Sequence, residues 1–295
     1  VIRSFIDEGI IEIHDNDFRV TEKINQASIP ETINEVILSR VDKLDEKTKE
    51  LLKTATVIGR NFYFKVSEEA ADTIGELDER LQYLKDVKLI GESKKKDEIE
   101  YLFKHALAQQ ATYESILMNT KKEMHLKIAR SIEKVFAENL NEFYATLAHH
   151  YEMAGNKEKT EEYLLKAGDE AMRSGASSEA LSFYKDALDR IPQNRKQDIS
   201  DIELRDLILK VAVAYEAVGE NKEALAIFET IFEKHFNFKF TKSEKGIWLR
   251  GIMSILHVVF AINNQKLFFR KKIDDDLELL LKYFDQWGHA LTTLN

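Results

Sequence analysis

Two hydrophobic periods meet near residue 105 of the chain. Before it, apolar side chains alternate with polar ones at Ile99, Tyr101 and Phe103, a spacing that predicts a strand. After it, apolar positions recur at nearly helical spacing at Leu107, Ala111, Ile116 and Leu117. We therefore expect a strand followed directly by a helix, and a joint between a compact mixed segment and an all-helical one.

The first 58 residues predict a small hairpin and two helices. Residues 1–27 indicate the end of a helix and then two short strands around a turn at Asp15–Asp17, since Asn and Asp favour tight turns. In residues 28–58 we expect two helices, the first starting at Pro30 and the second capped by Asp45. Gly59 follows as the residue that ends the second helix.

The next segment completes the element order of a winged helix. We expect a short helix at 66–71, a longer one at 76–87 and a strand at 89–90. A charged loop at 93–98 and a return strand at 99–103 would follow. Helices followed by a hairpin are typical of this motif, so residues 28–118 are assigned to a winged-helix domain.

The charges of this segment argue against DNA binding. The helix that would enter the major groove carries four acidic side chains against three basic ones between Glu76 and Lys88. The lysines at 94–96 are followed at once by Asp97 and Glu98. Because phosphate neutralisation dominates non-specific affinity, we expect no nucleic-acid partner.

The remainder of the chain predicts helices in pairs. Residues 119–142 form a connecting helix, and residues 143–240 a series of paired helices. Ala180, Tyr184, Ala187 and Pro192 have the spacing of the second helix of a tetratricopeptide repeat, a unit of about 34 residues. The pattern recurs in part from Ala224, and the extra length between the two occurrences falls in a polar loop at 193–201.

Two points in this array stay open at the level of sequence. The helix near 158–173 fits either the first or the second position of a pair. Residues 241–295 predict two more helices without the small-residue pattern, as in a capping unit, although the array can also continue beyond Asn295. The fold class expected overall is mainly α, with a winged helix and small hairpins followed by an α-solenoid.

Composition narrows the class of protein. The 295-residue chain has a net charge of −9, with acidic and basic residues interspersed. It contains no cysteine, and no apolar stretch reaches the roughly 20 residues of a membrane span. We therefore expect a cytoplasmic protein that binds no membrane. The chain begins at Val1 inside an amphipathic pattern, which indicates a piece of a longer protein.

Motifs for catalysis are missing from the sequence. It has no phosphate-binding P-loop, no zinc-protease motif and no nucleophile elbow. His149 and His150 are adjacent, so their rings would point about 100° apart on a helix, a poor geometry for one metal ion. We expect His125, His149 and Tyr151 to pack at helix contacts, and the acidic run at 274–276 to start a helix. No catalytic, cofactor-binding or metal-binding residue is predicted.

Three segments together resemble a known family. They are residues 29–44 (IPETINEVILSRVDKL), residues 51–62 (LLKTATVIGRNF), and residues 103–107 (FKHAL) with Tyr113 and His125. Their order, over about residues 1–190, is similar to the part of AAA/STAND signalling ATPases that follows the nucleotide-binding core. In those proteins a helical lid, a winged helix and tetratricopeptide repeats succeed one another, and residues 1–27 would be the end of the lid.

The resemblance implies a function and one site residue. Many such proteins carry an N-terminal class III adenylate or guanylate cyclase domain, so this chain would be the non-catalytic regulatory region of a cyclase-linked ATPase. ATP or ADP would bind the parent's upstream core, and a protein partner or neighbouring domain would bind the repeats. His105 corresponds to a histidine that senses ADP in related proteins, although Lys104 and Ala106 replace its usual neighbours.

Alternatives remain for both conclusions. His105 can instead cap its own helix. Arg40 and Asp42 are similar to an Arg-x-Asp of the family, for which we expect a role in helix packing. The chain can also belong to a STAND-type transcription regulator, or be a free-standing repeat scaffold.

Overall fold

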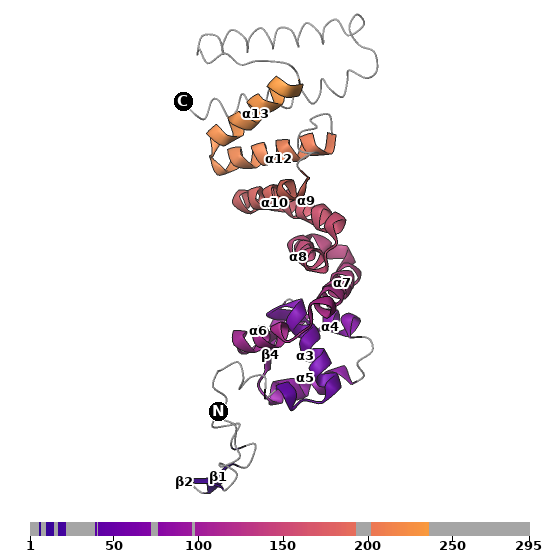
Figure 1. Ribbon diagram of the computed structural model, residues 1–295, viewed down its shortest axis with the longest axis vertical. Coiled ribbons are helices and arrows are strands. Elements are labelled where there is room, and N and C mark those ends of the chain that lie inside the picture. Colours follow the sequence, from indigo (N-terminus) through magenta and orange to yellow (C-terminus); the bar gives the residue numbers. More distant parts are fainter. Residues whose placement is uncertain are drawn as a thin grey trace, which may run out of the picture. The chain divides into compact units, whose positions relative to one another are not determined.

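A computed structural model describes residues 10–14, 17–21, 41–71, 76–95, 98–192 and 202–235, together with Ile6 and Ser39. The chain divides into two compact units, Val1–Thr160 and Glu161–Asn295, and each is described by itself. The described part is mainly helical, with small antiparallel hairpins (Figure 1). Within it, no helix combines the length and apolar character that crossing a membrane requires.

The first unit begins with the expected hairpin. Strands β1 (Ile11–His14) and β2 (Asp17–Val20) pair in antiparallel register. The backbone N–H of Thr21 donates to the carbonyl of Ile10 at 2.8 Å and closes the open end. On one face, Ile13 lies opposite Phe18, and both are exposed.

Helix α3 (Glu46–Ile58) starts and stops where the sequence predicts. The Asp45 carboxylate accepts a hydrogen bond from the backbone N–H of Thr48, which fills one of the donors left open in the first turn. Gly59 ends the helix at a φ of 147°, which favours glycine. The helix predicted before α3 lies almost entirely outside the described residues. At its end, Val41 and Asp42 are described and are helical.

Two shorter helices and a three-stranded sheet follow. The helices are α4 (Phe64–Ala70) and α5 (Leu77–Asp86). The strands are β3 (Asn61–Tyr63), β4 (Ile90–Lys95) and β5 (Glu98–Phe103). The strand order is β3-β5-β4, and both pairings are antiparallel.

The sheet corrects two sequence predictions. Strand β3 was not expected, because three residues between two helices give too short a pattern to recognise. The charged segment 93–98 is not simply a loop, since β4 continues to Lys95 and β5 begins at Glu98. Backbone hydrogen bonds of the hairpin extend these strands regardless of side-chain polarity.

The core of the first unit lies between α3, α5 and the sheet. Leu51 and Leu84 are fully buried, and Leu81 is buried with them. Phe62 of β3 is also fully buried and stacks on Tyr101 of β5 with a centroid separation of 5.5 Å. These contacts hold the helices on one face of the sheet.

Four further elements follow the sheet along the chain, and Ala108 and Ala111 of the first of them add to this core. They are α6 (Ala106–Glu114), α7 (Met118–Val135), the 3-10 helix η2 (Ala137–Phe143) and α8 (Tyr144–Ala154). The connecting helix predicted for residues 119–142 therefore ends earlier, at Val135, and a 3-10 helix follows it. Phe136 stacks on Phe143 at a centroid separation of 4.1 Å, and Tyr63 contacts both rings edge-on, which ties η2 to β3.

The described part of the second unit consists of helices. Helix α9 (Lys157–Arg173) begins in the first unit and ends in the second. It is followed by α10 (Ser177–Arg190), α12 (Ile202–Val218) and α13 (Asn221–His235), and α12 packs against both α10 and α13. The loop at 193–201 and the helices predicted for 241–295 lie outside the described residues.

Candidate functional site

His105 occupies the position that the sequence predicts. Strand β5 ends at Phe103 and α6 begins at Ala106, so His105 is the residue that precedes the first turn of α6. Its carbonyl accepts hydrogen bonds from the backbone N–H groups of Ala108 at 3.0 Å and Gln109 at 3.3 Å. The side chain is exposed. The strand-to-helix transition at His105 is thus confirmed.

His105 is the N-cap residue of α6, and it caps the helix through its backbone carbonyl alone. Its side chain makes no capping hydrogen bond to the first turn of α6. The backbone φ of −129° and ψ of 119° continue the extended direction of β5, and the side chain is exposed to solvent. The nucleotide-sensing role stays a prediction, and the exposed ring is accessible to a ligand.

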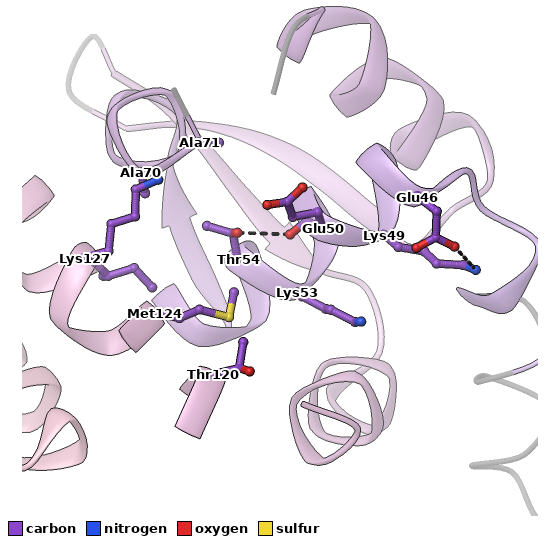
Figure 2. Close-up of a pocket in the computed structure, with 11 residues that line it drawn as sticks. Glu46, Lys49, Glu50, Lys53, Thr54, Ala70, Ala71, Thr120, Met124 and Lys127 are labelled. Atoms are coloured by element: carbon purple, nitrogen blue, oxygen red, sulfur yellow. Dashed lines mark hydrogen bonds and ion pairs between the residues drawn. The ribbon is translucent and has the colours of Figure 1, made fainter. Parts of the chain in front are cut away.

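A pocket opens elsewhere on the first unit, between α3, α4 and α7 (Figure 2). Its volume is about 370 Å³. The lining combines apolar side chains with lysines and glutamates, and in Figure 2 Met124 lies between Lys53 and Lys127. Its full lining is Glu46, Lys49, Glu50, Lys53, Thr54, Ala70, Ala71, Thr120, Met124, Lys127 and Ile128.

Three of the polar side chains that line this pocket, Glu46, Lys49 and Thr54, make contacts within α3. Lys49 forms an ion pair with Glu46 at 3.0 Å, one turn along α3. The Thr54 hydroxyl donates to the carbonyl of Glu50 at 3.0 Å, an ordinary contact within the helix. No lining side chain forms the pair of nucleophile and base that covalent catalysis requires.

A buried cluster of histidines joins three helices of the first unit. Nδ1 of His125, on α7, lies 2.9 Å from Nδ1 of His150, on α8. The other ring nitrogen of His125, Nε2, lies 3.0 Å from the hydroxyl of Tyr113, on α6. Both histidines are 1% exposed. The sequence predicts packing at helix contacts for His125, His149 and Tyr151. His125 and Tyr151 are buried, whereas His149 is exposed and its ring lies edge-on to that of His125 at a centroid separation of 5.8 Å.

Burial keeps both histidines neutral. It lowers the pKa of His125 to about 4, with smaller contributions in the same direction from the charges of His149 and Lys121. It also lowers the pKa of His150 to about 3, helped by His125 and His149. Near neutral pH the two rings therefore share hydrogen bonds without charge.

The two Nδ1 nitrogens of the histidine cluster are engaged with one another. Among the residues that the structure describes, no group of three His, Cys, Asp or Glu side chains could hold a metal ion. The two Nδ1 atoms face each other in a hydrogen bond, which leaves them unable to bind one ion together. The chemistry that these rings retain is the binding and release of protons.

Asp169 links three helices of the second unit. Its Oδ1 accepts hydrogen bonds from the Tyr184 hydroxyl of α10 at 2.7 Å and from Nζ of Lys210 of α12 at 2.8 Å. Burial raises the pKa of Tyr184, and the hydrogen bond to Asp169 raises it further. The tyrosine hydroxyl is therefore a fixed donor, and Asp169 connects one helix pair to the next.

Removing the Asp169 carboxylate should loosen these helices. We expect D169A to lower the free energy of unfolding by about 1 kcal/mol, because the hydrogen bonds are charged but half of the carboxylate side chain is exposed. Urea unfolding followed by circular dichroism measures the change. The matched control is D186A, at an exposed position on α10, which should change stability by less than about 0.5 kcal/mol. Equal effects of the two changes would contradict the role of Asp169.

Comparison of this chain with family models, with curated proteins and with solved structures finds no match. The geometry of the described residues is therefore the basis on which a function can be assigned.

Proposed function

We propose that this chain is a non-catalytic regulatory and protein-interaction region of a larger signalling ATPase of the STAND type, and that its parent is linked to a nucleotide cyclase. The observation that carries the protein-interaction role is a small residue recurring at one position in two successive helix pairs. Arrays of such pairs expose an extended surface that binds proteins through many side chains. The described residues supply no assembled catalytic centre that competes with this role.

The helix pairs support tetratricopeptide-like repeats. Gly168 and Ala180 lie 12 residues apart on α9 and α10, and Ala212 and Ala224 have the same separation on α12 and α13. Large aromatic side chains follow each second small residue by four positions, at Tyr184 and Phe228, and both are buried. This is the arrangement by which repeat helices cross closely and fill the groove between them.

The sheet supports a winged helix. A helix, a strand, two helices and a hairpin follow one another from Glu46 to Phe103, and the lone strand β3 pairs with β5, the second strand of the hairpin. This arrangement needs only a short wing between β4 and β5. This order supports the proposal of a winged domain from α3 to β5, in which α5 would hold the recognition position.

The charges of α5 argue against DNA as its partner. Arg80 is engaged by Asp45, with Nη1 and Oδ1 2.7 Å apart, and also by Glu76. Lys85 is engaged by Glu92 of β4 at 2.6 Å. Two of the basic groups that would meet phosphate are thus already paired within the domain, while Asp78 and Glu79 carry negative charge on the same helix. A protein surface suits this helix better than nucleic acid.

We place nucleotide sensing at His105. The exposed imidazole stands at the start of α6, where the open N–H groups of a helix favour an anion. In the proposed parent, the ATPase core would present ADP to this position. The alternatives are a repeat-containing STAND transcription regulator and a free-standing scaffold, which differ from the proposal in the domain that precedes the chain.

A binding experiment tests this proposal. The reading frame that encodes the chain is first followed upstream for a P-loop core, and that core is purified with ADP or with a non-hydrolysable ATP analogue. We expect the chain to bind the two nucleotide states with affinities that differ at least tenfold, about 1.4 kcal/mol, in isothermal titration calorimetry. H105A should abolish the difference, whereas Q110A, at an exposed site on the same helix, should preserve it.

Three results would contradict the proposal. An upstream frame without a P-loop leaves a free-standing scaffold. ATP hydrolysis or cyclic nucleotide synthesis by the chain itself makes it an enzyme. Binding to the core that is the same with both nucleotides, in the wild-type chain, removes the sensing role of His105.

A further inference from the structure

We propose that Tyr113, His125 and His150 form a pH-sensitive latch, which holds α8 on α7 while both histidines are neutral and releases α8 when both are protonated. The latch is defined by these three side chains, which come from three successive helices, α6, α7 and α8. The latch is independent of the proposed function, since it concerns only packing within the first unit.

The hydrogen bonds of the latch form one continuous chain. The Tyr113 hydroxyl meets His125 Nε2 at 3.0 Å, and His125 Nδ1 meets His150 Nδ1 at 2.9 Å. If the tyrosine donates to Nε2, His125 must carry its proton on Nδ1 and donate it to His150. The tautomers of the two rings are therefore linked, and each contact is satisfied while one proton lies between the Nδ1 atoms.

Double protonation is incompatible with this geometry. An imidazolium ring carries a proton on both nitrogens, so two charged rings would direct two N–H groups at each other across 2.9 Å. One hydrogen bond would be lost, and two like charges would be buried together. The rings must separate, and because His125 and His150 belong to α7 and α8, the helices must separate with them.

The neighbouring charged groups do not stabilise a buried imidazolium. The nearby charges that act on the pair are Lys121 on α7 and His149 on α8, and both disfavour protonation. Tyr113 is the titratable group that α6 contributes, and burial raises its pKa. Further charged groups on these helices and on the elements packed against them include Lys49 and Lys53 on α3, Glu68 and Glu69 on α4, Lys127, Glu133 and Lys134 on α7, and Glu138 and Glu142 on η2. The carboxylates of Glu46 and Glu50 on α3, Glu114 on α6, Glu123 on α7 and Glu152 on α8 are exposed.

The carboxylates in that set are occupied or exposed. Glu133 accepts a hydrogen bond from Tyr151 at 2.8 Å, and Glu69 binds Lys134 at 2.7 Å. Glu68, Glu138 and Glu142 are exposed. No carboxylate contributes to the pKa of either latch histidine among the described residues. A second proton can therefore enter only at the cost of opening the contact.

One atom of the latch is left unsatisfied. His150 Nε2 is buried and has no hydrogen-bond partner in the described structure. An unpaired buried polar atom destabilises the closed form, and an apolar side chain of similar shape would not carry this penalty. The closed latch is thus less stable than an apolar contact would be, so a smaller gain in free energy from protonation is enough to open it.

The direction of the pH effect follows from the two states. In the closed form the pKa values lie at about 4 and about 3, below the ordinary value of about 6.5 that an open, hydrated histidine recovers. Stability of the closed latch is therefore complete above pH 6.5 and is lost as the pH falls toward these values. Each histidine shifts the equilibrium toward the open form about tenfold per pH unit in this range, so two give about a hundredfold.

Hydrogen exchange of the full chain tests the latch. Amide protection in α8 is measured by mass spectrometry from pH 7 to pH 5 and corrected for the intrinsic pH dependence of exchange. We expect protection to fall by about a hundredfold per pH unit below 6.5 once opening of the latch governs exchange. Protection of α8 that is unchanged over this range would overturn the proposal.

Two matched variants separate the latch from general acid effects. H150N keeps an amide near the Nδ1 position but cannot titrate, so the slope should fall to about tenfold per pH unit. H149N changes the exposed neighbour on the same helix and should keep the hundredfold slope. The reverse result for the two variants would overturn the assignment.

A measurement on the unchanged chain covers the case in which H150N does not fold. Nitrogen NMR shifts of the imidazole rings report when each latch histidine gains its second proton. Both rings should become protonated together with the loss of α8 protection. Protonation of both rings while α8 stays protected would show that the contact tolerates charge and would overturn the latch.

Discussion

Replacing Phe62 by alanine should lower the free energy of unfolding of the first unit by about 3–5 kcal/mol. The ring is fully buried, and it contacts Tyr101 at 5.5 Å and Phe103 at 5.8 Å between ring centroids. Alanine removes the ring and leaves a cavity between the sheet and the helices. Because β3 has three residues, loss of this anchor should also detach it from β5.

The free energy of unfolding must be measured for the first unit alone, because Phe62 lies in that unit. Native-state hydrogen exchange at the amides of Leu51 and Leu52, in the buried part of α3, gives the free energy of opening around the core. The control is F18A, which removes the same side chain from a position that is 66% exposed and should change stability by less than about 0.5 kcal/mol. A similar small effect of F62A would contradict the placement of Phe62 in the core.

The sequence predicts best those elements whose signals are local. The cap at Asp45, the glycine at 59 and the strand over residues 99–103 each depend on a few neighbouring residues, and the structure confirms all three, although Ile99 itself is 39% exposed. Strand β3 could not be predicted, because three residues form a strand only through pairing with β5, some 40 residues further on. Long-range pairing overrides local pattern in such short segments.

The candidate sites show the same division. The position of His105 between strand and helix follows from the change of hydrophobic period. The partnership of His125 and His150 does not, since it depends on how α7 crosses α8. A partial signal exists: His125 precedes Ile128 and Ile132 by three and seven positions, which places it on the buried face of α7. The two helices predicted for residues 241–295 lie outside the described residues and stay a prediction.

In the second unit, Gly168→Ala should destabilise the chain by about 1–2 kcal/mol, although alanine is the better helix former by about 1 kcal/mol. A Cβ atom built on Gly168 would lie 2.4 Å from a ring carbon of Tyr184. That ring cannot easily move away, because Tyr184 is 2% exposed and its hydroxyl is bound by Asp169. Helices α9 and α10 would have to move apart by a fraction of an ångström at this crossing.

A double mutant shows whether the Tyr184 ring is the cause. Y184L removes the ring atoms that the new methyl group would meet, so the loss for G168A together with Y184L should be smaller than the sum of the two single losses by about 1 kcal/mol or more. Urea unfolding of the four proteins measures this coupling. If G168A stabilised the chain, as the same change does in an ordinary exposed helix, α9 and α10 could not cross as closely as described, and the main support for repeat-like helix pairs would be lost.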